Sequence, residues 1–140
     1  MNIYLQRHLV PLSACAVACL LTACATDRAQ SLRESAARLD DASSHFSSQL
    51  QYQGDDSRRG RVSSDAQTLA RAAHDLEHAL DRHDSRDNID SDYHRVTDGY
   101  EQLHTQLADE GYADQNRRLL VDFDHVTAAY RDVEAGMSHR

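Results

Sequence analysis

The sequence predicts an all-α protein, an antiparallel up-down-up-down four-helix bundle over residues 31–140, on three observations. Glycine and proline are scarce, with 5 Gly and 1 Pro in 140 residues, which disfavours the turn-rich sandwiches and barrels of all-β proteins. Apolar residues recur at alternating spacings of three and four in four separate stretches. No stretch sustains the alternation by two that a strand needs. With 40% hydrophobic residues in this pattern, the chain is also too apolar to be disordered.

The four stretches are each about 20 residues long, or about 30 Å as a helix. Each presents one apolar seam to the predicted core. The seam positions are Leu32, Ala36, Leu39, Ser43, Phe46 and Leu50; Val62, Ala66, Leu69, Ala73, Leu76 and Leu80; Ile89, Tyr93, Val96, Tyr100, Leu103 and Leu107; and Leu119, Phe123, Val126, Tyr130, Val133 and Met137. Short connections between the stretches predict that neighbouring helices run antiparallel.

Two serines predict helix starts. Ser31 with Glu34, and Ser64 with Gln67, have the spacing of a capping box, in which a side-chain oxygen accepts a hydrogen bond from a free backbone N–H group. The charged segment 54–60, GDDSRRG, is the longest predicted connection.

Other breaks are predicted between the second and third helices and after the third. The cap-forming run 84–88 is typical of a tight turn, and Gly111 suits the left-handed end of a helix. Gly99 lies inside the third helix, where it costs about 1 kcal/mol relative to alanine.

The N-terminal segment has the pattern of a secretory signal. Residues 1–8 carry Arg7, and residues 9–23, LVPLSACAVACLLTA, hold no charge but are too few to span a bilayer as a helix. The segment ends in Leu-Thr-Ala-Cys at residues 21–24, which resembles the lipobox of bacterial lipoproteins. The resemblance implies cleavage between Ala23 and Cys24 and a covalent lipid, such as palmitate, on Cys24. It covers the first 24 residues only.

The remaining cysteines agree with this interpretation. Cys15 and Cys19 lie in the segment that would be removed, so the mature chain keeps one thiol and forms no internal disulfide. The resemblance further implies that Ala25, where an aspartate would retain a lipoprotein in the inner membrane, directs the protein to the outer membrane, facing the periplasm. The predicted organisation is therefore a signal peptide over 1–23, a lipidated tether over 24–30 and a helical bundle over 31–140.

Charge disfavours nucleic acid as a partner. The 15 basic residues are all arginine and stand against 23 acidic ones, a net charge of −8, whereas phosphate contacts need a basic face. Loss of Arg7 with the signal peptide makes the mature chain −9.

Histidine offers the one indication of a binding site. His74 and His78 lie one turn apart on the outward face of the second helix, and His94 and Asp98 lie one turn apart on the third. If the hairpin turns near residue 86, these four residues are at similar heights and form a candidate site for a divalent transition metal. Outward faces of packed helices diverge, so the alternative is a solvated polar surface that binds no cofactor.

Other chemistry is not indicated. HDLEH at 74–78 is not the HExxH of zinc proteases, the acidic run at 81–92 lacks the glycine and closing glutamate of a calcium loop, and there is no CxxCH for haem. The inward tyrosines are expected to pack in the core with their hydroxyls at its rim. No nucleophile motif is present, and the chain is not expected to be an enzyme.

Two functions follow as expectations. One is a non-catalytic, membrane-anchored periplasmic lipoprotein whose bundle binds another envelope protein; the other is a periplasmic metal-binding bundle. Because imidazole has a pKa near 6.5, protonation of the histidines near pH 5 would bring the net charge toward −1. Since His45, His74, His78, His94 and His125 are expected on the surface, acidification should weaken attraction to a cationic partner and promote self-association.

Overall fold

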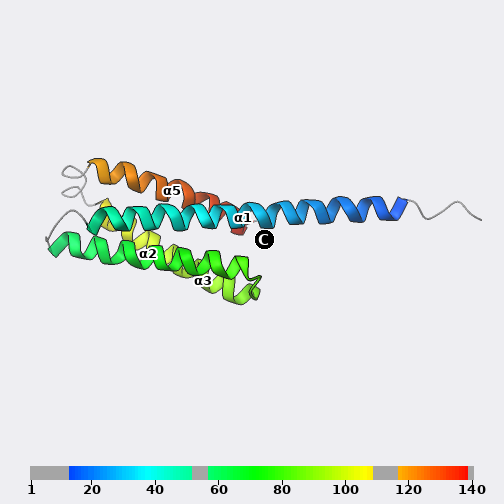
Figure 1. The fold of residues 1–140 in the computed structure, drawn as a ribbon, viewed down its shortest axis with the longest axis horizontal. Coiled ribbons are helices and arrows are strands. Elements are labelled where there is room, and N and C mark those ends of the chain that lie inside the picture. The colour runs from blue at the N-terminus through cyan, green and yellow to red at the C-terminus, as the bar shows by residue number, and fades with distance from the viewer. Residues whose placement is uncertain (1–12, 52–56, 109–116, 139–140) are drawn as a thin grey trace, which may run out of the picture.

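The computed structural model describes the backbone of residues 13–51, 57–108 and 117–138, and most side chains from residue 27 onward within these ranges. The described chain forms four helices: α1 (Ser13–Gln51), α2 (Ser57–Asp81), α3 (Arg86–Leu107) and α5 (Arg117–Ser138) (Figure 1). None of the described residues belongs to a strand. The predicted all-α four-helix fold is therefore confirmed.

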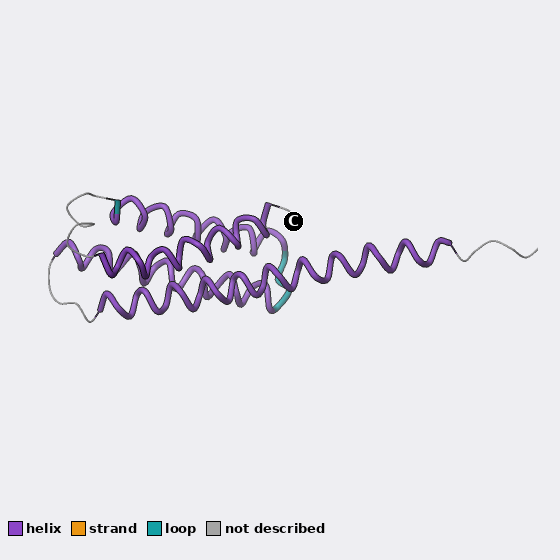
Figure 2. The backbone as a smooth tube through the Cα atoms, turned by 90° about the horizontal axis from the view of Figure 1, so that it is seen from above, coloured by secondary structure: helices purple, strands orange, loops and turns teal. Residues whose placement is uncertain are grey.

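The helices lie side by side in antiparallel order. α1 packs against α2 and α5, and α2 packs against α3. In two perpendicular views the bundle has the same elongated shape, with the α2–α3 turn and the end of α5 at one end (Figures 1 and 2). Side chains between α3 and α5 complete the ring of four helices.

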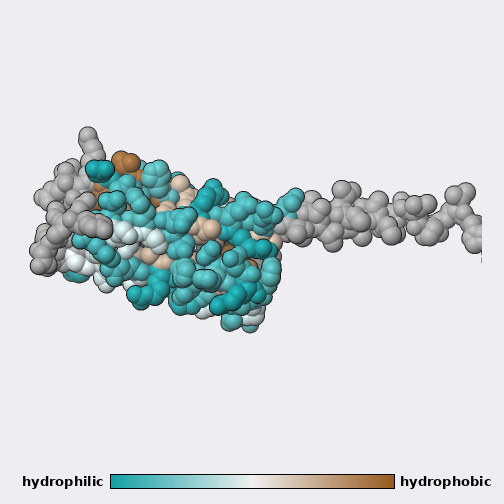
Figure 3. Space-filling model, in the orientation of Figure 1, coloured by the Kyte–Doolittle hydropathy of each residue, from teal (hydrophilic) through white to brown (hydrophobic). Residues whose placement is uncertain are grey.

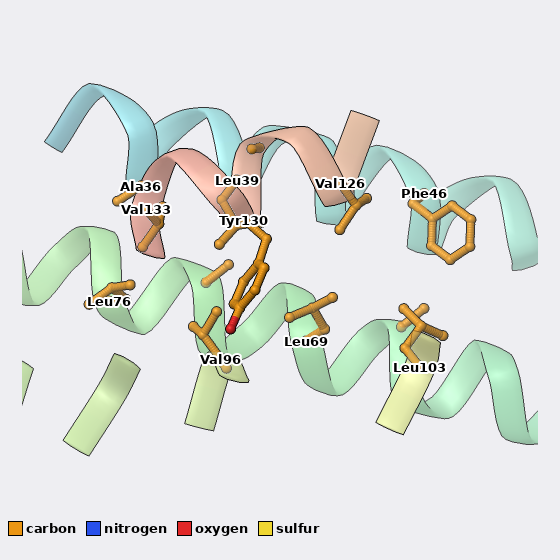
Figure 4. Packing of buried hydrophobic residues seen from close by; sticks show 14 of the residues in the cluster. Ala36, Leu39, Phe46, Leu69, Leu76, Val96, Leu103, Val126, Tyr130 and Val133 are labelled. Carbon is orange, nitrogen blue, oxygen red and sulfur yellow. The ribbon is translucent and has the colours of Figure 1, made fainter. Parts of the chain in front are cut away.

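The core is built from the predicted seams. Every seam position is buried except Tyr93, Tyr100 and Met137, which are partly buried and pack against the others. Figure 4 shows Leu39, Leu69 and Tyr130 converging from three helices on the bundle axis. Burying one such leucine contributes about 1.5–3 kcal/mol, so this shared core is the main source of the fold's stability.

Aromatic rings fill the space between α3 and α5. The ring of Tyr100 stacks on that of Tyr130, with centroids 4.1 Å apart and planes 9° apart, and on that of Phe123 at 5.7 Å. The Tyr100 hydroxyl donates to Thr127 Oγ1 at 3.2 Å, and the Tyr130 hydroxyl donates to Thr97 Oγ1 at 3.4 Å. Tyr100 and Tyr130 therefore pack in the core with their hydroxyls hydrogen-bonded across the helix pair.

Gly99, the apparent exception to helix propensity, lies where α3 passes close to α2. A β-carbon at Gly99 would be 3.4 Å from Leu69 Cα, at the lower limit of ordinary van der Waals contact with the backbone. The close approach of the two helices explains why the smallest residue occupies this helical position.

The α2–α3 connection is a tight turn, but it lies at residues 82–85 and not at the predicted 84–88, because residues 86–88 already belong to α3. The N–H of His83 donates to Leu80 O at 3.3 Å and the N–H of Asp84 to Ala79 O at 3.0 Å, the paired bonds of a Schellman motif. His83 takes the left-handed conformation, with φ of 54°, at the position where glycine is usual. Ser85 then caps α3, because its side chain accepts the backbone N–H three residues later at 3.3 Å.

The predicted helix starts at Ser31 and Ser64 are wrong. Both residues lie inside helices, α1 having begun at Ser13 and α2 at Ser57. The residues before Ser31 are rich in Ala, a good helix former, so nothing forces a break there, whereas α2 includes the poor helix former Gly60 before Ser64. The connection predicted at residues 54–60 is therefore shorter than expected, because residues 57–60, including Gly60, belong to α2. Gly54 and Gly111 lie outside the described residues.

Helix α1 extends beyond the bundle. Its N-terminal part projects past the other three helices in both views (Figures 1 and 2). Side chains of residues 27–31 are exposed, and Leu32, 5% exposed, is the first core residue of α1 among the side chains described. Residues 24–30, predicted as a tether, are therefore helical and continuous with the bundle; we call them the stem. None of the described helices has the length and apolar character needed to cross a membrane.

Candidate functional site

One group of potential metal ligands lies on the outer face of α2. The ligand atoms of His74, Glu77 and His78 all lie within 4.8 Å of one another. Their spacing of i, i+3 and i+4 places them on one helical surface, and we call them the α2 histidine cluster. The two imidazole rings meet edge to face, with centroids 4.4 Å apart. The cluster combines two nitrogen ligands and one carboxylate, a set used by zinc and other divalent transition metals.

Asp40 of α1 orients the first of these histidines. The Nδ1–H of His74 donates to Asp40 Oδ2 at 3.0 Å, which leaves Nε2 with its lone pair for another partner. This hydrogen bond raises the pKa of His74 above its ordinary value of 6.5, and the nearby charges of Glu77 and Asp75 act in the same direction, while burial opposes them. A carboxylate on the far nitrogen is the arrangement that fixes a metal-binding histidine.

Two arginines flank the cluster in a depression of about 420 Å³. Arg95 Nη1 lies 3.4 Å from Asp75 Oδ2, and its other terminal nitrogen contacts the carboxylate of Asp92. Arg82 Nη2 lies 3.1 Å from Asp84 Oδ2. Each guanidinium therefore has a carboxylate partner, so neither arginine takes Glu77 away from the cluster.

The predicted four-residue metal site is brought together only in part. His74 and His78 are neighbours, but His94 and Asp98 on α3 are not members of the cluster. Both are exposed, and the ring of His94 lies beside that of Tyr93, with centroids 6.3 Å apart. Equal height along two packed helices is not enough to bring these four side chains together, because the outward faces of the two helices point in different directions.

Sequence reasoning missed two members of the arrangement. Glu77 was visible inside HDLEH, three residues after His74, and the i, i+3 spacing was the pattern that could have found it. Asp40 lies 34 residues from His74 and reaches it only because α1 packs against α2. No local pattern identifies that contact.

The rest of the described surface is strongly polar. Val121, 54% exposed, is the only exposed large hydrophobic residue in the part of the chain whose side chains are described. The face shown in Figure 3 is predominantly hydrophilic. The expected outward placement of His45, His74, His78, His94 and His125 is confirmed, since all five are exposed. A partner would therefore meet a polar, acidic surface.

The predicted lipidation site lies on the stem. The backbone of Cys24 is part of α1, one helical turn before Arg28 and two turns before Leu32. At 1.5 Å per residue, Cys24 stands about 12 Å along the helix axis from the first core layer. Comparison with protein-family models, with curated proteins and with solved structures finds no match to this chain.

Proposed function

We propose that this protein is a non-catalytic lipoprotein of the bacterial cell envelope, anchored through lipid on Cys24 and binding another envelope protein through its helical bundle. The observation that carries the proposal is the lipobox-like LTAC at residues 21–24, followed by a helical stem, whose side chains are exposed from residue 27 to residue 30, and then by a folded bundle. Such a stem places one end of the bundle next to the membrane surface and leaves its polar sides accessible. Ala25 supports an outer-membrane, periplasm-facing location under the sorting rule that the lipobox implies.

A cationic protein partner fits the surface best. The mature chain has a net charge of −9, and its described side chains present Val121 as the sole large exposed hydrophobic group. Recognition of this surface depends on charge and hydrogen bonding, and such interactions weaken with salt.

Fractionation of Cys24→Ser and wild-type protein tests the anchor. We expect wild type in the outer-membrane fraction and the variant either unprocessed or released. If both proteins fractionate and migrate identically, the lipoprotein proposal is wrong.

Co-purification tests the partner. Wild-type protein from detergent-solubilised membranes should retain a basic protein at low salt and lose it near 1 M salt, where the screening length is about 3 Å. Retention that does not change with salt, or a partner of acidic character, would contradict a charge-based interface.

The α2 histidine cluster favours a second candidate function, the binding of a divalent transition metal in the periplasm. We propose His74 and His78 as ligands, Glu77 as the third, and Asp40 as the group that orients His74. Isothermal titration with Zn²⁺, Cu²⁺ and Ni²⁺ measures this directly.

The variants His74→Ala and His78→Ala should abolish stoichiometric binding, and Asp40→Asn should weaken it about 10- to 100-fold. His94→Ala removes an equally exposed histidine outside the cluster and should leave binding unchanged. Weak, non-stoichiometric heats for wild type, or equal effects of His94→Ala and His74→Ala, would rule out this second function.

A further inference from the structure

A cleft of about 810 Å³ opens at the end of the bundle from which the stem emerges. Its walls come from α1, from the α2–α3 turn and from the last turns of α5. Core residues Leu32, Leu80 and Ile89 contribute apolar atoms to its lining. Gly136 of α5 also lines it, and a β-carbon there would lie 2.7 Å from Leu32 Cδ1, so α5 and α1 approach closely at this point. We call this feature the stem cleft.

The stem cleft is basic in an otherwise acidic protein. Arg28, Arg33 and Arg38 of α1 all line it, opposed by Asp84 and Asp132. Arg38 Nη2 lies 3.3 Å from Asp132 Oδ2, so these two charges compensate each other.

The other lining carboxylate is also matched. Asp84 Oδ2 lies 3.1 Å from Arg82 Nη2. Arg28 and Arg33, in contrast, form no ion pair within the described residues. Two guanidinium groups therefore remain to bind an anion, and the planar fork of arginine suits the oxygens of a phosphate.

If the proposed lipid anchor exists, the position of the stem cleft identifies the source of that anion. Arg28 follows Cys24 by one helical turn, about 6 Å along the axis. The headgroup layer on each side of a bilayer is about 5–8 Å thick. A lipid on Cys24 therefore holds Arg28 at the level of the headgroups. Arg33 stands about 14 Å from Cys24 along the axis, just above this layer, so the mouth of the cleft between the two arginines faces the headgroups.

We propose that the stem cleft binds the phosphate headgroup of an anionic phospholipid such as phosphatidylglycerol, with Arg28 and Arg33 donating hydrogen bonds to the phosphate oxygens. The inference rests on the proposed lipoprotein function. It adds a second membrane contact to the anchor and fixes which end of the bundle faces the bilayer.

Lipid retention by the full acylated protein tests the proposal. The protein is extracted in a neutral detergent and incubated with equal amounts of phosphatidylglycerol and phosphatidylcholine, and the bound lipid is measured by native mass spectrometry. A basic residue near an anionic surface contributes about 1 kcal/mol, so loss of two should weaken binding of phosphatidylglycerol about thirtyfold. We therefore expect wild type to prefer phosphatidylglycerol and Arg28→Gln/Arg33→Gln to lose that preference.

The double variant Arg71→Gln/Arg118→Gln is the matched control. It removes the same charge from exposed arginines that do not line the cleft, and it should keep the preference. Equal loss in both double variants, or equal retention of the two lipids by wild type, overturns the proposal. Competition by inorganic phosphate at concentrations equal to those of the lipid also overturns it, because the cleft would then be a site for free anions.

Labelling of the same preparations with radioactive palmitate separates this inference from the proposed function. If Cys24 is labelled but the protein shows no lipid preference, the lipoprotein proposal stands and the proposed lipid site in the stem cleft is wrong. Unlabelled Cys24 overturns the anchor and with it the placement of the cleft at the headgroups.

Discussion

The phenol of Tyr130 makes the stability of the bundle sensitive to alkaline pH. Its side chain lies between α3 and α5, 7% exposed, with its hydroxyl directed at Thr97. Burial, which disfavours the charged phenolate, raises the pKa of Tyr130 from 10 to about 12, and the hydrogen bond to Thr97 offsets part of this effect. In the unfolded chain the same group ionises near pH 10. The stability that the neutral Tyr130 side chain contributes is therefore fully present below about pH 10 and is lost as pH rises through about 12.

The size of the effect follows from the two pKa values. A difference of two units corresponds to about 2.7 kcal/mol in all, of which about 1.4 kcal/mol is lost by about pH 11. Tyr130→Phe has no ionisable group but loses the hydrogen bond to Thr97, which costs about 1 kcal/mol. We expect the variant to be about 1 kcal/mol less stable than wild type near pH 7 and about 0.4 kcal/mol more stable than wild type near pH 11.

Urea unfolding followed by far-ultraviolet circular dichroism measures both proteins across this pH range. Taking their difference at each pH cancels the ionisation of groups that the two chains share. Thr97→Val removes the hydrogen-bond acceptor but keeps the phenol, so its stability should fall with pH at least as steeply as that of wild type. A wild-type advantage over Tyr130→Phe that stays constant from about pH 7 to about pH 11 would refute the reasoning.

Four further variants test the packing and the α2 histidine cluster. Leu69→Ala should lower the free energy of unfolding by about 2.7–5 kcal/mol in urea titrations, because it opens a cavity beside α3, whereas exposed Val121→Ala should change it by less than about 0.5 kcal/mol. Ser43→Ala should raise it by about 1 kcal/mol, since Ser43 Oγ is buried without a hydrogen-bond partner in the described structure; a loss of stability would contradict this. Asp40→Asn should lower the pKa of His74 toward 6.5 in an NMR titration, and an unchanged value would show that the hydrogen bond is not its cause.

The core could be predicted because it depends on a local rule. A helix repeats every 3.6 residues, so the seam running through Leu39 and Leu69 is visible without any knowledge of which helices touch. The same rule does not determine where a helix begins. Ser31 satisfies the capping-box spacing, yet the residues before it continue the helix, because a serine is tolerated inside a helix when nothing disrupts the preceding turn.

The candidate site could be predicted only where it lies on one helix. His74 and His78 are neighbours by spacing alone, whereas their relation to His94 depends on how two faces are rotated about their axes. Asp40 is brought to His74 by the packing of α1 on α2, a contact across 34 positions in the sequence. The stem cleft was not predicted for the same reason, since it joins residues from three parts of the chain.

The intact mass of the protein extracted from bacterial membranes tests the central claim most directly. We expect a chain that begins at Cys24 and carries the additional mass of covalently bound lipid on that residue. A chain that begins elsewhere, or one that begins at Cys24 without lipid, would contradict it.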